Sequence, residues 1–166
     1  MRRQRRAPDV PVAAGERILA NATGTEGTVL AGTRDAFYVA APGADVVRVP
    51  WEDVEAADWD NDTDRFRLSE VGSWGEQRRE HVVTIDEPGR LLELVRERVT
   101  ASVVLQRRVD VHGRRGLRVI ARRAPRGDQP VKWVYEYDEG VDPADPAVAA
   151  AARDALEVAR RDVGMP

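Results

Sequence analysis

The sequence predicts an α+β protein: a run of about seven short antiparallel strands, an amphipathic helix, a three-stranded antiparallel meander and a C-terminal helix. Three observations support this prediction. Residues 16–85 alternate short apolar runs with breaker residues, a four-residue apolar repeat follows, and the chain ends in a helical pattern with clear start and stop signals. With 166 residues, 42% of them hydrophobic, the chain can form one substantial domain, or one domain with a small appended unit.

The first strands are separated by turn-forming residues. In 63–70, Phe66 and Leu68 alternate with charged and polar residues, as a half-buried strand requires. Asn61 and Asp62 lie between two strand-like runs and can supply a tight hairpin turn. The predicted strands are 16–21, 26–32, 35–40, 44–49, 53–60, 63–70 and 79–85.

The amphipathic helix is expected to begin at Asp86, as N-cap, with Pro88 in its first turn. Its apolar side chains recur every four residues and predict one face packed on a core. The C-terminal end is ambiguous, because residues 102–105 also suit a strand. The face is formed by Leu91, Val95, Val99 and Val103.

The second part of the chain predicts three more strands and a helix. The first two strands meet at a turn over 113–116, and Trp133, Tyr135 and Tyr137 share one face of the third. The last helix is expected to be capped by Asp145, with Pro146 at its first position, and to end at Gly164. Its buried face is expected to contain Val148, Ala152, Leu156, Ala159 and Val163.

These patterns divide the chain into three segments. Residues 1–14 are basic and lack any period, and they are interpreted as a flexible arm. Residues 15–105 are expected to form the first domain. Residues 106–166, the meander and last helix, bury little surface alone and are expected to pack on the first unit or on a second subunit.

Seven strands followed by one helix resembles the pleckstrin-homology-like (PH-like) barrel, and Val47–Val54, with its Pro50-Trp51 corner, resembles bacterial PH-like and GRAM-like modules. The whole chain, including Tyr137–Pro146, is similar to uncharacterised proteins of high-GC actinobacteria. The resemblance implies a barrel capped by the helix, and a module that binds phosphoinositides, peptides or proteins. Lipid-binding members use a basic first loop, whereas 21–26 has no basic residue, which argues against phosphoinositide binding.

Composition and motifs exclude several chemistries. The absence of cysteine removes disulfides, thiolate nucleophiles and cysteine-ligated metals, and suits a cytoplasmic location. No apolar stretch reaches the roughly 20 residues of a membrane helix. Nucleotide-binding glycine motifs and the Gly-x-Ser-x-Gly elbow are absent, and His81 and His112 have no metal-site spacing. No cofactor or catalytic residue is therefore predicted.

Residues 58–64 begin like a calcium loop, with carboxylates at alternate positions. Thr63 replaces the required glycine, and Ser69 stands where the bidentate glutamate should be. The segment is therefore interpreted as a solvated hairpin tip, and no metal site is predicted.

Charge is unevenly distributed, and its pattern marks the candidate partner surface. Residues 51–64 contain seven acids and no base. The region around 107–126 is rich in arginine, which suits phosphate or carboxylate ligands, although its charge can also be self-paired or solvated. The candidate binding arginines are Arg107, Arg108, Arg114, Arg115, Arg118, Arg122, Arg123 and Arg126.

Trp74, in a glycine-rich connection, is a further candidate anchor, although folding back over the barrel mouth is its favoured interpretation. The sequence thus favours a non-enzymatic interaction or scaffold module that binds a protein partner, with self-association left open. Nucleic-acid binding through the arginine-rich hairpin 107–126 is the first alternative. An enzyme with an unrecognised site is the second.

Overall fold

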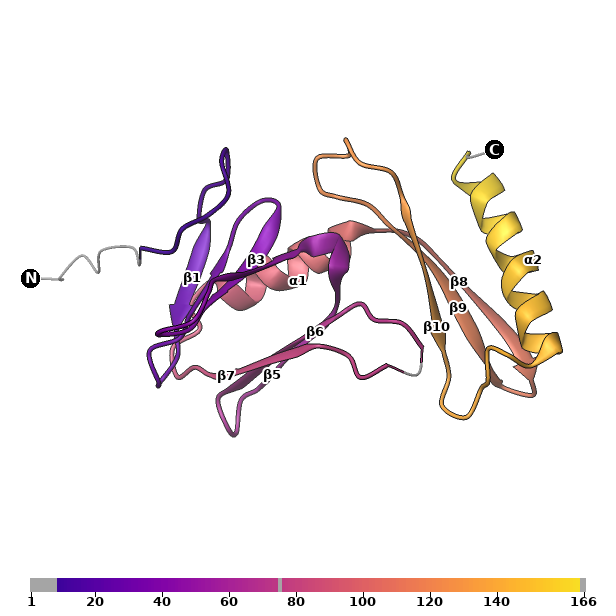
Figure 1. Ribbon diagram of the computed structural model, residues 1–166, viewed down its shortest axis with the longest axis horizontal. Coiled ribbons are helices and arrows are strands. Elements are labelled where there is room, and N and C mark those ends of the chain that lie inside the picture. The colour runs from indigo at the N-terminus through magenta and orange to yellow at the C-terminus, as the bar shows by residue number, and fades with distance from the viewer. Residues whose placement is uncertain (1–8, 75, 165–166) are drawn as a thin grey trace, which may run out of the picture. The chain divides into compact units, whose positions relative to one another are not determined.

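The computed structural model describes residues 9–74 and 76–164, and these form a mixed α+β structure (Figure 1). Its strands make three antiparallel sheets, of four, three and three strands. The chain divides into two compact units. Of the described residues, the first unit comprises 9–71 and 78–101, and the second comprises 72–74, 76–77 and 102–164.

The first unit contains all seven strands that the sequence predicted, each starting one to four residues later than expected. The four-stranded sheet, in the order β1-β2-β3-β4, consists of β1 (Ala20–Thr23), β2 (Val29–Gly32), β3 (Ala36–Ala40) and β4 (Val47–Pro50). A single 3₁₀ turn, η1 (Trp51–Asp53), leads into the second sheet. That sheet, in the order β5-β6-β7, consists of β5 (Val54–Asp60), β6 (Arg65–Glu70) and β7 (Glu80–Thr84).

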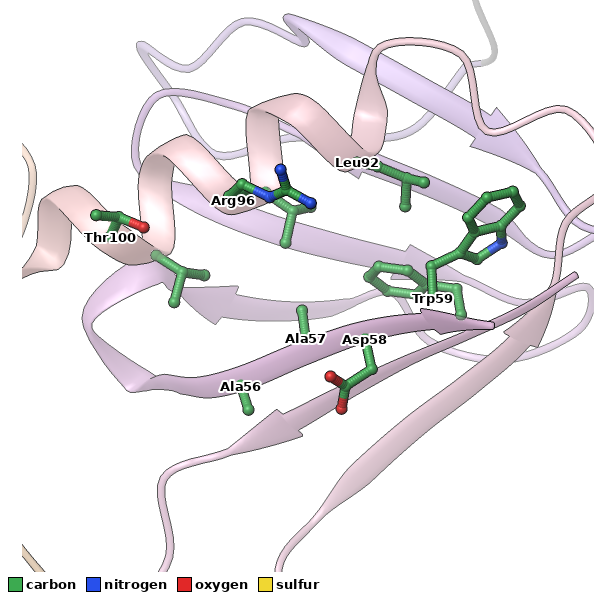
Figure 2. A pocket seen from close by; sticks show the side chains of 10 residues that line it. Ala56, Ala57, Asp58, Trp59, Leu92, Arg96 and Thr100 are labelled. Atoms are coloured by element: carbon green, nitrogen blue, oxygen red, sulfur yellow. The ribbon is translucent and has the colours of Figure 1, made fainter. Parts of the chain in front are cut away.

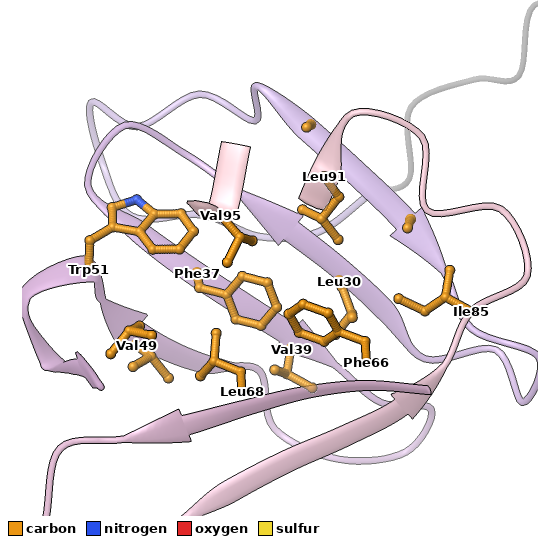
Figure 3. Packing of buried hydrophobic residues seen from close by; sticks show 13 residues of the cluster. Leu30, Phe37, Val39, Val49, Trp51, Phe66, Leu68, Ile85, Leu91 and Val95 are labelled. Carbon is orange, nitrogen blue, oxygen red and sulfur yellow. The ribbon is translucent and has the colours of Figure 1, made fainter. Parts of the chain in front are cut away.

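The core of this unit is shared by both sheets and α1 (Leu91–Ser102). Phe37 of β3 is fully buried, with its ring centroid 5.7 Å from that of Phe66 in β6 and 5.9 Å from that of Trp51 (Figure 3). The Trp51 indole N–H donates to the Thr33 carbonyl at 3.0 Å, so its one polar atom is satisfied in the core. Apolar burial from three elements therefore holds the unit together.

The seven strands do not close into one sheet among the residues described. Their sheet orders leave β5 and β7 at the two edges of the second sheet. One backbone hydrogen bond, from the Thr25 N–H to the Thr84 carbonyl at 3.0 Å, joins the turn after β1 to the end of β7. The expected antiparallel α+β architecture is thus confirmed, whereas a barrel is not.

The prediction for the start of the first helix was wrong. The helix begins at Leu91, not Asp86, because Gly89 adopts a left-handed φ of 56° and forms a turn in which the Leu91 N–H donates to the Pro88 carbonyl. A residue in that conformation cannot continue a right-handed helix. At the other end both sequence patterns are realised, since α1 ends at Ser102 and a strand begins at Val103.

The four-stranded sheet has a second apolar face, covered by the N-terminal segment. Val10 is buried and Val12 is partly buried in a small cluster with Ala31 and Tyr38. The Ala13 N–H donates to the Tyr38 hydroxyl at 3.0 Å. Val10 and Val12 of the predicted arm are therefore packed on the sheet, while its arginines at 2, 3, 5 and 6 lie outside the described residues.

A buried carboxylate holds this segment to the sheet. Glu16, whose side chain is 4% exposed, accepts hydrogen bonds from Thr33 Oγ1 at 2.6 Å, Tyr38 OH at 2.8 Å and Arg48 Nε at 3.1 Å. Burial acts to raise the pKa of Glu16, but the three donors together outweigh burial and lower that pKa below its ordinary 4.5. We call these four residues the Glu16 cluster.

The second unit is a three-stranded sheet with one helix on it. The sheet, in the order β10-β9-β8, consists of β8 (Val103–His112), β9 (Arg115–Arg122) and β10 (Lys132–Tyr137). The helix is α2 (Pro146–Asp162), and the Asp145 side chain caps it by accepting from the Ala147 N–H at 2.9 Å. The predicted cap, first proline and terminal glycine are confirmed.

The core of this unit lies between α2 and one face of the sheet. Leu117 and Val119 of β9 are fully buried against Val148 and Ala159 of α2. Trp133, Tyr135 and Tyr137 pack against the same cluster, as the sequence predicted. No helix in the described part of the chain combines the length and apolar character needed to cross a membrane.

Candidate partner-binding site

A pocket of about 390 Å³ opens between β5 and α1 within the first unit (Figure 2). Ala57 and Trp59 extend from β5 toward the helix, and Leu92 lies over the Trp59 end while Thr100 lies toward the Ala56 end. Most side chains that face the pocket are apolar, which suits an apolar ligand group. The β5–α1 pocket is lined by Ala56, Ala57, Asp58, Trp59, Phe66, Leu92, Val95, Arg96, Val99 and Thr100.

The pocket adjoins an open sheet edge, and the hydrogen-bond pattern shows which backbone groups face that edge. The Ile85 N–H donates to the Asp64 carbonyl at 2.7 Å, and the Glu70 N–H donates to the Arg79 carbonyl at 2.9 Å. The residues of β6 that bond to β7 are therefore the even-numbered ones. Because bonding alternates along an antiparallel strand, the odd-numbered residues of β6 bond to β5.

In β5, the partners of those odd-numbered β6 residues are Ala56, Asp58 and Asp60. The N–H and C=O groups of Ala57 and Trp59 consequently point away from β6, toward the edge where no further strand of the described chain pairs. The same two residues direct their side chains into the pocket. Unpaired backbone groups and an apolar cavity thus occur together at one edge.

Two details show that the pocket reaches the strand itself. Ala56 and Asp58 line it although their side chains point away from α1 in Figure 2, so they contribute backbone. The Trp59 indole Nε1 is buried and has no hydrogen-bond partner among the described residues. A buried donor left unpaired costs about 1–3 kcal/mol, so a ligand acceptor that reached it would be favoured.

The charges around the pocket lie on two sides. Arg96, on α1, is exposed at its rim. On the opposite face of the β5–β6 ladder, Asp58 pairs in register with Arg67, and Asp60 pairs with Arg65. Of the seven acids in 51–64, Glu55, Asp58 and Asp60 are in the edge strand β5, and the other four are in η1 or in the turn after β5.

The sequence did not reveal this pocket. Its one local signal is Ala57, whose small side chain leaves room on the face of the strand that is turned toward α1. A β-bulge between Val54 and Ala56 shifts the register there, so simple alternation from Val54 would place Ala57 on the wrong face.

The predicted binding arginines of the second unit do not form one surface. Arg114 and Arg115 are at the β8–β9 turn, whereas Arg123 and Arg126 follow the other end of β9. Arg122 is 4% exposed and donates to Ser102 Oγ at 3.2 Å. The structure thus separates residues that are close together in the sequence.

Several of these arginines are paired within the unit. Arg107 contacts Asp162 of α2 at 3.1 Å, and Arg108 contacts Asp138 at 2.7 Å and Asp110 at 3.1 Å. The Arg108 guanidinium, together with the Gly116 N–H, lowers the pKa of Asp138 from 3.8 to about 2. These contacts favour self-pairing for Arg107 and Arg108.

The remaining cations of this set are more accessible. Arg114, Arg115 and Arg123 are exposed. Arg118 is half-buried, and in the pairing of β9 with β10 it lies opposite Glu136. Because the exposed ones lie at opposite ends of β9, nucleic-acid binding through them stays a prediction. Trp74 is 60% exposed, so it is not folded into a core and its role as an anchor also stays a prediction.

Both histidines face carboxylates. His81 Nε2 lies 2.7 Å from Glu70 Oε2, and His112 Nε2 lies 3.0 Å from Asp145 Oδ2. The His112 contact, followed by the Ala147 N–H, lowers the pKa of Asp145. These contacts give each histidine a structural role.

The calcium-like segment forms the β5–β6 hairpin tip. Asp60 Oδ1 accepts from the Asp62 N–H at 2.9 Å, and Asp64 has a left-handed φ of 54°. The turn covers residues 61–64, longer than the Asn61-Asp62 turn expected. Among the described residues, no three metal-ligating side chains gather at one place.

Comparison with known proteins adds no relative: no protein-family model matches the chain, and no curated protein sequence matches it.

Proposed function

We propose that the protein is a non-enzymatic interaction module with a PH-like first unit, and that it binds a protein partner in the β5–α1 pocket. The observation that carries this proposal is the apolar pocket of about 390 Å³ beside an unpaired sheet edge. Protein segments, unlike most small molecules, can use both the cavity and the edge. A cytoplasmic location, for which a chain without cysteine is suited, belongs to the same proposal.

The lining of the pocket favours binding over catalysis. Its titratable side chains are Asp58, which points away from α1, and Arg96, which lies at the rim. General acid–base chemistry needs groups that converge on a reacting atom, and these two do not converge. The seven-strand, one-helix order and the shared core of both sheets with α1 support the PH-like assignment.

Two alanines provide a matched test. Ala57→Leu fills the pocket from its floor, whereas Ala147→Leu adds the same atoms at an exposed position of α2 that does not line the pocket. Affinity purification from native cell extract is expected to recover the same partner with the wild type and with A147L, and to lose it with A57L. Recovery of that partner by a folded A57L variant at the wild-type level would refute the proposal.

A further inference from the structure

We propose that the protein forms a symmetric dimer in which β10 of one chain pairs antiparallel with β10 of a second copy. The three-stranded sheets of the two copies would then become one continuous sheet. The pairing is centred on Val134, which lies opposite Val134 of the other copy. This surface belongs to the second unit, so the inference goes beyond the proposed function, which concerns the first.

The hydrogen bonds between β9 and β10 show which backbone groups of β10 face the open edge. The Asp138 N–H donates to the Gly116 carbonyl at 3.0 Å. Because bonding alternates along an antiparallel strand, the even-numbered residues of β10 bond to β9. The N–H and C=O groups of Trp133, Tyr135 and Tyr137 therefore point to the edge where no further strand of the described chain pairs.

The opposite edge of the same sheet is protected against pairing. By the same alternation, the backbone groups at the β8 edge belong to Gln106, Arg108 and Asp110, whose side chains are exposed. The register of β8 also shifts near both of its ends, and edge charges and bulges both hinder the addition of a strand. In β10 the three edge residues are aromatic, and the register runs without a shift from Lys132 to Tyr137. The contrast marks β10 as the edge suited to pairing.

The side chains of the same three residues form an aromatic row that α2 covers only in part. The helix packs mainly on β8 and β9, and Trp133, Tyr135 and Tyr137 stay half-buried at the margin of the core. The ring centroids of Tyr135 and Tyr137 are 6.2 Å apart. In the dimer the two rows lie on one sheet face, with Trp133 opposite Tyr135 of the other copy. Burial of this aromatic surface favours association.

The side chains on the other face select the register. Centred on Val134, the pairing places Lys132 opposite Glu136 of the other copy. A pairing centred on Tyr135 would place each Val134 opposite a carboxylate, and one centred on Glu136 would place two carboxylates together. Glu136 already lies opposite Arg118 of β9, so Lys132 sets the register and the apolar contacts supply the affinity. The strand is thus complementary to itself, as a two-fold interface requires.

Charge at the two-fold axis provides the first test. Sedimentation equilibrium of the full wild-type chain at high micromolar concentration should give twice the mass of one chain. Val134→Lys and Val134→Glu should each weaken association at least about tenfold, because like charges then face each other. An equimolar mixture of the two variants should restore the dimer, which mixing could not do for a folding defect. Gln106→Lys, at the protected β8 edge, is the control and should leave association unchanged.

Two results of this experiment would overturn the inference. One is a wild-type chain that stays monomeric at millimolar concentration. The other is a mixture of V134K and V134E that associates no more than either variant alone.

A single cysteine provides the second test, in a chain that has none. Because Val134 bonds to β9, its pair across the axis is of the non-hydrogen-bonded kind, with Cα atoms about 4.5 Å apart. That separation lies within the range of a disulfide. Val134→Cys should therefore give a covalent dimer under mild oxidation, whereas Gln106→Cys at the same concentration should not. Equal formation of covalent dimer from both positions would contradict the proposed pairing.

Discussion

Replacing Glu16 with glutamine should destabilise the first unit strongly, because its carboxylate is almost fully buried and accepts three hydrogen bonds. Thr33 donates to Oε1, whereas Tyr38 and Arg48 donate to Oε2. An amide that keeps its oxygen toward Thr33 turns an NH₂ group toward two donors. Those two bonds to a charged acceptor are worth about 1.5–3 kcal/mol each.

The stability lost with these two hydrogen bonds is smaller than their sum, because the Arg48 side chain is 39% exposed and can turn to water. We therefore expect E16Q to lower the free energy of unfolding of the first unit by about 2–3 kcal/mol. Exchange of β2 and β3 amides, measured by mass spectrometry, reports the first unit separately from the second. Those amides should exchange about 30- to 150-fold faster at neutral pH.

The pH dependence follows from the lowered pKa of Glu16. A depressed carboxyl pKa contributes stability above the unfolded value of 4.5, and that stability is lost as the pH falls through the folded value. The gap between wild type and E16Q should therefore be constant near neutrality and narrow below pH 4.5. Glu157→Gln, which removes an exposed pair with Arg161, is the control, and an equal effect of both substitutions would refute this reasoning.

Three further substitutions test other parts of the structure. Gly116→Ala should destabilise the second unit by at least about 3 kcal/mol in urea unfolding, because the new Cβ would overlap the Val109 carbonyl oxygen. Asp138→Asn should reduce stability at neutral pH, and the loss should shrink as the pH falls from 3.8 toward about 2, where Asp138, held low by Arg108, is protonated in the wild type too. Trp74→Ser should change the free energy of unfolding by less than about 0.5 kcal/mol, since the Trp74 side chain is 60% exposed.

Each of these predictions has a result that would contradict it, and the first also has a control variant. Gly113→Ala meets open space at a φ of 63° and should cost only about 1 kcal/mol, so equal effects at 113 and 116 would contradict the packing described. Persistence of the full Asp138→Asn effect near pH 2 would contradict the pKa assignment. A large loss of stability in Trp74→Ser would show that this side chain is packed.

Much of the secondary structure was predictable because it depends on local patterns. Alternation around Phe66 and Leu68 identified β6, and the Asp145-Pro146 pair identified the start of α2. Periodicity alone placed Leu91 and Val95 correctly in the core but could not locate the first turn of the helix, since that depended on the conformation of Gly89.

What the sequence could not predict depends on long-range contacts. Val10 has no periodic pattern around it, and its burial requires the outer face of β1–β4 to exist first. The arginines that looked like one cluster are spread along extended strands, so that Arg114 and Arg123 lie beyond opposite ends of β9. The pocket required knowing that β5 is an edge strand and that α1 lies over it.

The most direct test of partner binding at the β5–α1 pocket is site-specific photo-crosslinking in native cells. A photoreactive amino acid in place of Thr100, at the exposed rim of the pocket, should form a covalent adduct with one protein, and A57L should abolish that adduct. The same group in place of Asp154, exposed on α2, should not form it. An adduct that survives A57L, or one formed equally from position 154, would contradict the account.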